Sequence, residues 1–164
     1  MASLQPSVLK MIRQNHAIEH ATMHILARRN SQLHLLAHSD WAGFTIYGEV
    51  NTEAVIEAVT EGLLRLRQGE SNLAIHPRCG TNLAVPIGIS GGMLLTAMSL
   101  PKEWRFTRFT LALLAGVAFA IRKTLSLAVQ RHVTTTSDVH DVRVRAIQHL
   151  QQQGIQIHRV LLGS

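Results

Sequence analysis

The sequence contains a single cysteine, Cys79, so no disulfide bond can form within the chain. Aromatic residues are also scarce, at 4%, which argues against a surface that stacks the bases of single-stranded nucleic acid. The N-terminal stretch MASLQPSVLKMIRQNH lacks the apolar core and the cleavage site of a signal peptide. These absences argue against a disulfide-stabilised protein and against a protein secreted through a cleaved signal.

Positive charge is concentrated in the second half of the chain. Residues 1–82 carry seven Lys or Arg and seven Asp or Glu, whereas residues 83–164 carry nine and three, giving the net charge of +6. The excess lies beside the most apolar segments, at Lys102, Arg105, Arg108, Arg122, Lys123 and Arg131. This placement suits an anionic membrane surface better than a DNA groove. We therefore expect a lipid bilayer as a partner and no nucleic acid.

The first half of the chain predicts a mixture of helices and strands. Residues 7–29 have apolar side chains at helical spacing after a plausible N-cap at Ser7, and residues 52–68 predict a second helix. Between them, the segments 33–40 and 43–50 predict a β-hairpin, and residues 73–77 a further short strand. The resulting order α-β-β-α-β is typical of an α+β fold.

The C-terminal part of the chain returns to polar, strand-like sequence. Residues 142–150 and 155–162 both contain alternating apolar and polar positions around a Gln/Gly turn. We expect these segments to be strands beside those of the first half, although the stretch AIQHLQQQ is also compatible with a helix.

Two apolar segments separate these parts. Residues 83–100 contain no charge in 18 positions, nearly the thickness of a bilayer core at about 1.5 Å per residue. Residues 109–129 are long enough to span if Arg122 and Lys123 extend to an interface. We predict a two-helix transmembrane hairpin; the alternatives are a buried hairpin of a soluble protein and a re-entrant pair. The expected organisation is an N-terminal α+β metal-site region (1–82), the hairpin (83–130) and a C-terminal β-rich segment (131–164) packing on the first.

The segment HAIEHATMH, residues 16–24, contains the pattern H-x-x-E-H of the inverted zincins. Because His16 and His20 are one helical turn apart, both rings can hold one metal ion, and Glu19 can act as general base on metal-bound water. On a helical projection Glu19 borders the apolar arc, so we expect the carboxylate to be partly buried and the histidines, including His24, to be more exposed. The alternative is a solvated helix face.

The segment HPRCG, residues 76–80, matches the zinc-knuckle turn C-P-x-C-G with histidine in place of the first cysteine. Proline and glycine shape a tight turn that lets His76 and Cys79 meet one ion; the alternative is an ordinary turn with Cys79 in the core. Together with His16 and His20 these residues make the four ligands that zinc prefers. A mixed His/Cys set favours zinc, with iron or copper as alternatives. His24 is a spare ligand candidate.

The two motifs and the apolar hairpin resemble an uncharacterised bacterial family of small membrane proteins, known as a domain of unknown function, with HAIEHAT and HPxCGTN motifs. The chain also distantly resembles a family of predicted metal-dependent membrane enzymes with the motifs HGAEHK and HPRCGTS. That second resemblance is confined to residues 16, 19, 20 and 76–81, and this chain has Ala21-Thr22 where the pattern has a lysine. The resemblance implies a metal-dependent protein of a bacterial cell membrane without specifying a reaction.

Two functions remain open on this basis. The first is a membrane-anchored metal-dependent hydrolase with Glu19 as general base, which requires an open position on the metal, so that not all four candidates bind at once. The second is a non-catalytic scaffold or assembly subunit of a membrane complex, in which a structural metal fixes the N-terminal helix to the HPRCG turn and Glu19 orients a ligand. Metal sensing is a third interpretation.

Overall fold

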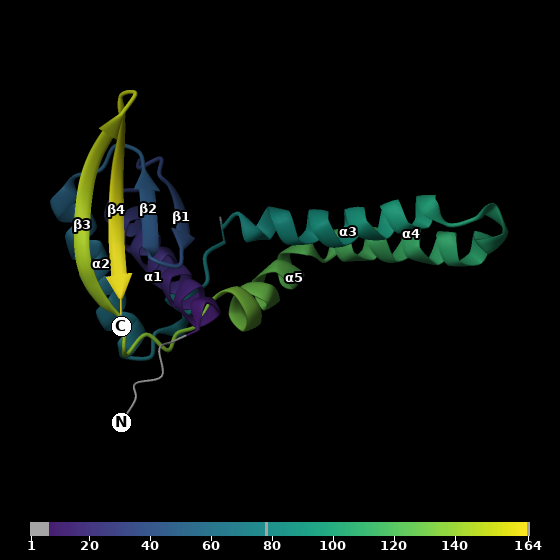
Figure 1. Cartoon of the computed structure of the whole chain (residues 1–164), viewed down its shortest axis with the longest axis horizontal. Coiled ribbons are helices and arrows are strands. Elements are labelled where there is room, and N and C mark those ends of the chain that lie inside the picture. Colours follow the sequence, from purple (N-terminus) through teal and green to yellow (C-terminus); the bar gives the residue numbers. More distant parts are fainter. Residues whose placement is uncertain (1–6, 78, 164) are drawn as a thin grey trace. The chain divides into compact units, whose positions relative to one another are not determined.

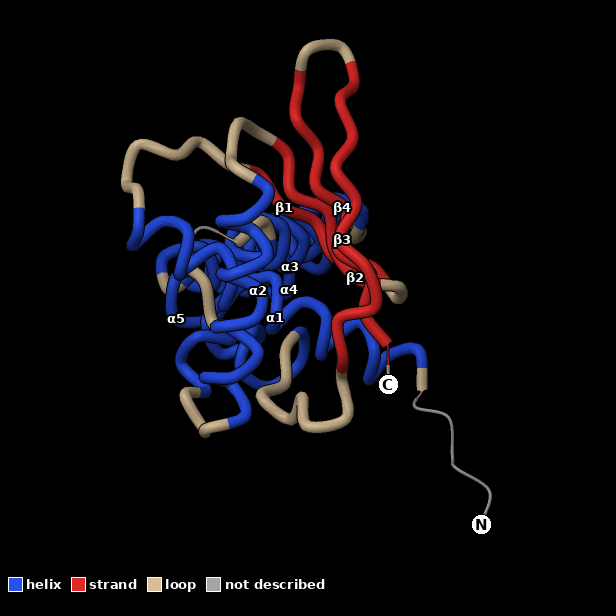
Figure 2. The backbone as a smooth tube through the Cα atoms, turned by 90° about the vertical axis from the view of Figure 1, so that its left-hand side faces the viewer, coloured by secondary structure: helices blue, strands red, loops and turns tan. Residues whose placement is uncertain are grey.

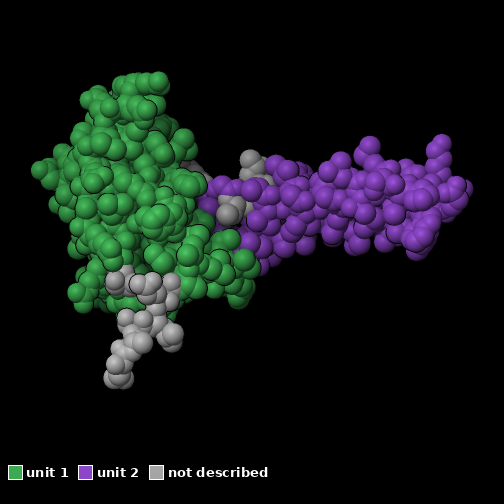
Figure 3. All heavy atoms as spheres, in the orientation of Figure 1, with its two compact units in different colours: residues 1–76, 131–164 green, residues 77–130 purple. Residues whose placement is uncertain are grey.

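The computed structural model describes residues 7–77 and 79–163 and divides the chain into two compact units (Figure 3). Unit 1 is formed by Met1–His76 together with Arg131–Ser164, and unit 2 by Pro77–Gln130. The chain therefore leaves unit 1 after His76 and returns to it at Arg131. Each unit has its own packing and is described by itself.

Unit 1 is built on a four-stranded antiparallel sheet with the order β1-β2-β4-β3 (Figure 1). The strands are β1 (Leu36–Asp40), β2 (Gly43–Tyr47), β3 (Arg143–Gln152) and β4 (Ile155–Gly163). The C-terminal strand β4 pairs with the N-terminal strand β2, with Ile46 opposite His158. The expected mixture of helices and strands is thus confirmed, including the placement of the C-terminal strands beside the N-terminal hairpin.

The turn between β1 and β2 is fixed by Asp40. Its Oδ1 accepts hydrogen bonds from the backbone N–H of Ala42 at 2.8 Å and of Gly43 at 3.1 Å, and from Arg159 of β4 at 2.8 Å. Burial would raise the pKa of Asp40, but the bonds from Arg159 and the two N–H groups outweigh it and lower the pKa. Gly43 has φ +150°, and a Cβ there would overlap the carbonyl oxygen of Val160.

Helices α1 (Val8–Arg29) and α2 (Thr52–Arg67) cover one face of the sheet (Figures 1 and 2). The Ser7 side chain accepts from the N–H of Lys10 and thereby caps α1, as expected. The core between helices and sheet includes Ile18, Ile25, Phe44, Ile46, Val55, Val59, Leu66, Val160 and Leu162. The two helices approach closely at Gly62, where a Cβ would lie 3.1 Å from that of Ala21.

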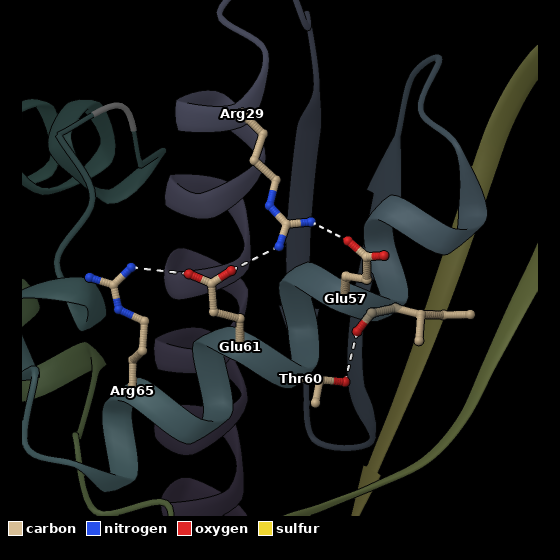
Figure 4. A network of polar contacts seen from close by, with 6 residues as sticks. Arg29, Glu57, Thr60, Glu61 and Arg65 are labelled. Carbon is tan, nitrogen blue, oxygen red and sulfur yellow. Dashed lines mark hydrogen bonds and ion pairs between the residues drawn. The ribbon is translucent and has the colours of Figure 1, made fainter.

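Ion pairs join the C-terminal end of α1 to the middle of α2 (Figure 4). Arg29 of α1 contacts Glu57 at 2.6 Å and Glu61 at 2.9 Å, and Arg65 contacts Glu61 at 3.2 Å. Within α2, the Thr60 hydroxyl donates to the carbonyl of Ile56 at 2.8 Å. The carboxylates of Glu57 and Glu61 are therefore engaged by arginines.

The strand expected at residues 73–77 is wrong. The segment instead forms a 3₁₀ helix, η1 (Ser71–Ala74), which packs on α1. Leu73 and Ala74 are both buried in the core that α1 shares, rather than alternating between two faces as in a strand. An apolar run of three residues carries too little periodicity to distinguish these structures.

Unit 2 consists of the helices α3 (Thr81–Ser99), α4 (Arg105–Ala120) and α5 (Arg122–Val129), with a 3₁₀ turn at Lys102–Trp104. Helix α3 packs along α4 and α5. The second apolar segment, expected to be one helix, is thus divided at Ile121, directly before Arg122 and Lys123. Among the described residues, no single helix has both the length and the hydropathy to cross a membrane; the segments Lys102–Ala120 and Arg122–Thr134 reach both only together, with a bend of 75°.

Unit 2 has small and polar residues inside and large apolar residues outside. Its buried side chains include Ser90, Ala97, Ala115, Ser126 and Gln130. Gln130 donates to the Asn82 side chain at 2.6 Å, and Ser126 to the Asn82 carbonyl at 3.3 Å. Its exposed apolar side chains include Ile87, Leu94, Leu95, Met98, Phe106, Phe109, Leu113 and Val117.

Candidate metal centre

A cluster of four histidines lies where α1 meets the end of the η1 segment in unit 1. Helix α1 supplies His16, His20 and His24, and the chain supplies His76 shortly after η1. The ring centroids of His16 and His20 are 4.2 Å apart, those of His20 and His76 5.6 Å, and those of His24 and His76 4.7 Å. Two imidazoles bound to one tetrahedral metal ion have ring centres about 5 Å apart. The spacings are thus in the range for shared coordination.

The expected exposure of the histidines is wrong for His20. Its side chain is 1% exposed, and His16 and His24 are half-buried. The helical projection placed His20 opposite the apolar arc, but η1 packs on that side of α1 and covers it. A projection shows which residues share a face and cannot show that a distant segment covers a polar face.

Backbone carbonyls orient three of these rings. Nδ1 of His16 lies 3.1 Å from the carbonyl oxygen of Thr134, and Nδ1 of His20 lies 2.7 Å from that of Ala74. Nε2 of His24 lies 2.8 Å from the carbonyl oxygen of Ile75. Because a carbonyl only accepts, each of these nitrogens carries the proton in the neutral ring. The opposite nitrogen is then the one with a lone pair, as in metal-bound histidines.

His20 has the strongest character of a ligand. Burial, with smaller contributions from His16 and other histidines, lowers the pKa of His20 to about 3 despite the bond to Ala74. The ring is therefore neutral near pH 7. Its Nε2 atom is buried and has no hydrogen-bond partner among the residues that the structure describes. An unpaired buried lone pair costs free energy unless a proton donor or a cation occupies the space beside it.

Glu19 is buried beside this cluster, with an exposed fraction of 7%. Burial raises the pKa of Glu19, whereas the neighbouring His16 and a hydrogen bond from Ser39 of β1 lower it, and the net direction is upward. The prediction of a partly buried carboxylate at the border of the apolar arc is confirmed. The carboxylate of Glu19 therefore lies close to both His16 and Ser39 of β1.

Cys79 belongs to unit 2 and lies three positions after His76 in the chain. A fully extended chain advances at most about 11 Å over three residues. Two further histidines form a separate pair in the sheet, where the rings of His149 and His158 stack at 4.8 Å. Nε2 of His158 lies 3.0 Å from the Thr52 hydroxyl oxygen.

The carbonyl groups that hold the rings cannot be identified from the sequence. Ala74, Ile75 and Thr134 act through backbone atoms, which any residue type supplies. His24, treated as a spare from its spacing, is in ring contact with His76. That contact depends on how the segment after η1 crosses α1.

Comparisons with known proteins identify relatives without an established activity. Residues 11–147 match the family described as "Domain of unknown function (DUF6391)". An uncharacterised protein of Picosynechococcus sp. is 39% identical over 140 residues, which cover 77% of this chain and 67% of that protein. No solved structure matches the chain. The matched range includes α1 from Met11 onward, η1 and all of unit 2, and the expected resemblance to an uncharacterised family is confirmed.

Proposed function

The chain belongs to the DUF6391 family, and we propose that it is a membrane-anchored protein that binds one transition-metal ion through the histidine cluster. His16, His20 and His76 are the proposed ligands from unit 1, and Cys79 is the proposed fourth ligand on sequence spacing alone. The observation that carries the proposal is the buried Nε2 of His20, which has no partner in the described residues. The soft thiolate beside imidazoles makes zinc the first candidate.

Metal content tests this proposal directly. The intact protein, purified in mild detergent without added metal, is expected to contain about one equivalent of zinc by mass spectrometry. His16→Ala and His20→Ala should lose it, whereas His38→Ala, which removes an exposed histidine of β1, should retain it.

Stability provides a second measurement, because His20→Ala also removes a buried side chain. Chelation should lower the Tm of the wild type, and zinc should restore it, since a ligand that binds only the folded state stabilises it. A wild type that contains no metal and whose Tm does not respond to zinc would contradict the proposal.

The second part of the proposal places unit 2 in lipid. Its interior of small and polar side chains and its apolar exterior match the packing of membrane helices, in which small residues meet and large apolar residues face the acyl chains. Phe106 and Met98 are 84% and 74% exposed, and large apolar side chains exposed in this way are typical of surfaces that contact a membrane or a partner. The basic residues near the apolar segments suit an anionic membrane surface.

The two tryptophans allow a test of this placement. Trp41→Phe leaves Trp104 of unit 2 as the only tryptophan, and Trp104→Phe leaves Trp41 of unit 1. In vesicles of brominated lipid we expect strong quenching of Trp104 fluorescence and weak quenching of Trp41. Equal quenching of both tryptophans, or quenching of neither, would contradict the insertion of unit 2 into lipid without unit 1.

A second candidate function is metal-dependent hydrolysis with Glu19 as the general base. The supporting observation is the burial of this carboxylate next to His16, a proposed ligand. Metal-dependent hydrolases use a carboxylate next to a metal ligand to take a proton from the metal-bound water. The non-catalytic alternative gives Glu19 the role of fixing a ligand, and one substitution separates the two (see Discussion).

A further inference from the structure

A second polar site lies on unit 1 next to the segments that hold the histidines. A cavity of about 410 Å³ is formed by residues 71–75 and 131–137. Its described lining consists of Ser71, Asn72, Ala74, Ile75, Arg131, Thr135, Thr136 and Ser137. The volume is in the range of small-molecule sites and exceeds the need of a single bare ion.

The lining offers hydrogen-bond donors and one positive charge. Hydroxyl groups come from both segments, an amide from Asn72, and a guanidinium from Arg131. None of the described lining residues is acidic. Among the described residues Arg131 takes part in none of the ion pairs, so no carboxylate in this part of the chain neutralises its charge.

The acidic residues that flank the two segments are directed to other partners. Glu70, which precedes Ser71, receives hydrogen bonds from Arg65 at 2.6 and 2.9 Å. Asp138, which follows Ser137, interacts electrostatically with Lys10, and Asp141 pairs with Lys10 at 2.9 Å. The cavity therefore keeps a net positive character.

From these features we infer that the cavity binds a small molecule carrying a phosphate or similar oxyanion. A guanidinium surrounded by hydroxyl and amide donors matches the several acceptor oxygens of such a group. A neutral polyol would use the hydroxyls but leave the charge of Arg131 unmatched. The remaining volume accommodates a small organic group attached to the anion, from either a soluble ester or a lipid headgroup.

This site is coupled to the histidine cluster through the backbone. Ala74 and Ile75 line the cavity, and their carbonyl oxygens accept the hydrogen bonds of His20 and His24. Thr135 also lines it and follows Thr134, whose carbonyl orients His16. A bound anion that orders both segments fixes these carbonyls and hence the rings. The proposed coupling therefore rests on the proposed metal function, whereas the binding of an anion in the cavity does not.

The first experiment measures anion binding to the metal-free, full-length protein in detergent, by calorimetry with glycerol 1-phosphate. We expect glycerol 1-phosphate to bind the wild type saturably and glycerol not to bind. Arg131→Gln should weaken binding about tenfold, the loss expected when a charged hydrogen-bond partner is removed. Arg143→Gln, which removes an exposed arginine of β3 outside this lining, should bind as the wild type does.

Short-chain phosphatidic acid, which carries the same phosphate on a lipid, separates the two sources. Tighter, competitive binding of this lipid assigns the site to a headgroup, and equal or weaker binding assigns it to a soluble ester. Absence of saturable binding of either probe to the wild type, or an unchanged affinity of Arg131→Gln, would overturn the inference.

The second experiment measures the coupling. Saturating glycerol 1-phosphate should tighten zinc binding by about fivefold or more, and zinc should tighten anion binding by the same factor. If the anion binds but does not change the affinity for zinc, the proposed coupling is contradicted and the proposed anion site is not. If the protein binds the anion but no zinc, the metal proposal fails alone.

Discussion

At the scale of single residues, the clearest feature is that the roles of the histidines are set by backbone groups. Each carbonyl that accepts from His16, His20 or His24 selects a tautomer and leaves the other ring nitrogen as the electron-pair donor. Among these rings, His20 is almost fully buried, and its Nε2 lone pair is costly to bury without a proton donor or a cation beside it.

The role of Glu19 can be decided by one substitution at this scale. Glu19→Gln keeps the size of the side chain and its ability to bond with Ser39, so we expect zinc content near one equivalent to persist. If Glu19 is a general base, hydrolysis of model ester and phosphate substrates should fall by about 10²–10⁴-fold. Zinc content and turnover are measured on the same preparation.

Loss of zinc in Glu19→Gln would instead assign the carboxylate to holding a ligand, since such neighbours typically contribute about 10–100-fold to metal affinity. Glu53→Gln is a matched control, because Glu53 is an exposed carboxylate at the start of α2. It should change neither measurement.

At the scale of elements, Asp40 connects three parts of the sheet. Its carboxylate bonds two N–H groups of the β1–β2 turn and Arg159 of β4. Because these partners stabilise the charged form, its pKa is lower in the folded than in the unfolded protein, where it is about 3.9. The stabilisation is complete above the unfolded pKa and is lost as the pH falls through the folded pKa.

We therefore expect Asp40→Asn to lower the Tm at neutral pH and to lose less stability than the wild type when the pH is taken below about 4. The Tm of both proteins is followed by circular dichroism from pH 7 to pH 3. Glu49→Gln, which removes an exposed carboxylate elsewhere in unit 1, should keep the acid dependence of the wild type. A constant difference between Asp40→Asn and wild type across this range would exclude the mechanism.

Elements with a local signal were predictable from the sequence. Helices α1 and α2 and the hairpin of β1 and β2 follow from periodicity, caps and the turn at Ala42-Gly43. The structure of residues 71–76 was not predictable, because it depends on packing against α1, which lies some fifty residues earlier in the chain. The burial of His20 was missed for the same reason: the residue types of the cluster are visible in the sequence, whereas the covering element and its carbonyls are not.

At the scale of the whole molecule, unit 2 is an insertion within unit 1. All members of the main core cluster come from unit 1. Ile75 and Arg131, on either side of the insertion, line the same cavity and hence lie near each other. Unit 1 has what an independent domain requires, namely its own core and closely spaced ends at the point of insertion.

Replacing residues 77–130 by a short Gly/Ser linker should consequently leave unit 1 folded. We expect a cooperative thermal transition, circular dichroism typical of mixed helix and sheet, and solubility without detergent, because the exposed apolar side chains of unit 2 are gone. A shortened protein that aggregates or melts without a cooperative transition would show that unit 1 needs unit 2.

The position of β4 between β2 and β3 has a consequence for biosynthesis. A ribosome delivers β1 and β2 early, but their neighbour in the sheet comes from residues 155–163, after every residue of the insertion has been translated. Until then one edge of β2 has no strand beside it, and such edges recruit foreign chains. The apolar helices of the insertion therefore emerge before the sheet that carries the histidine helix can close.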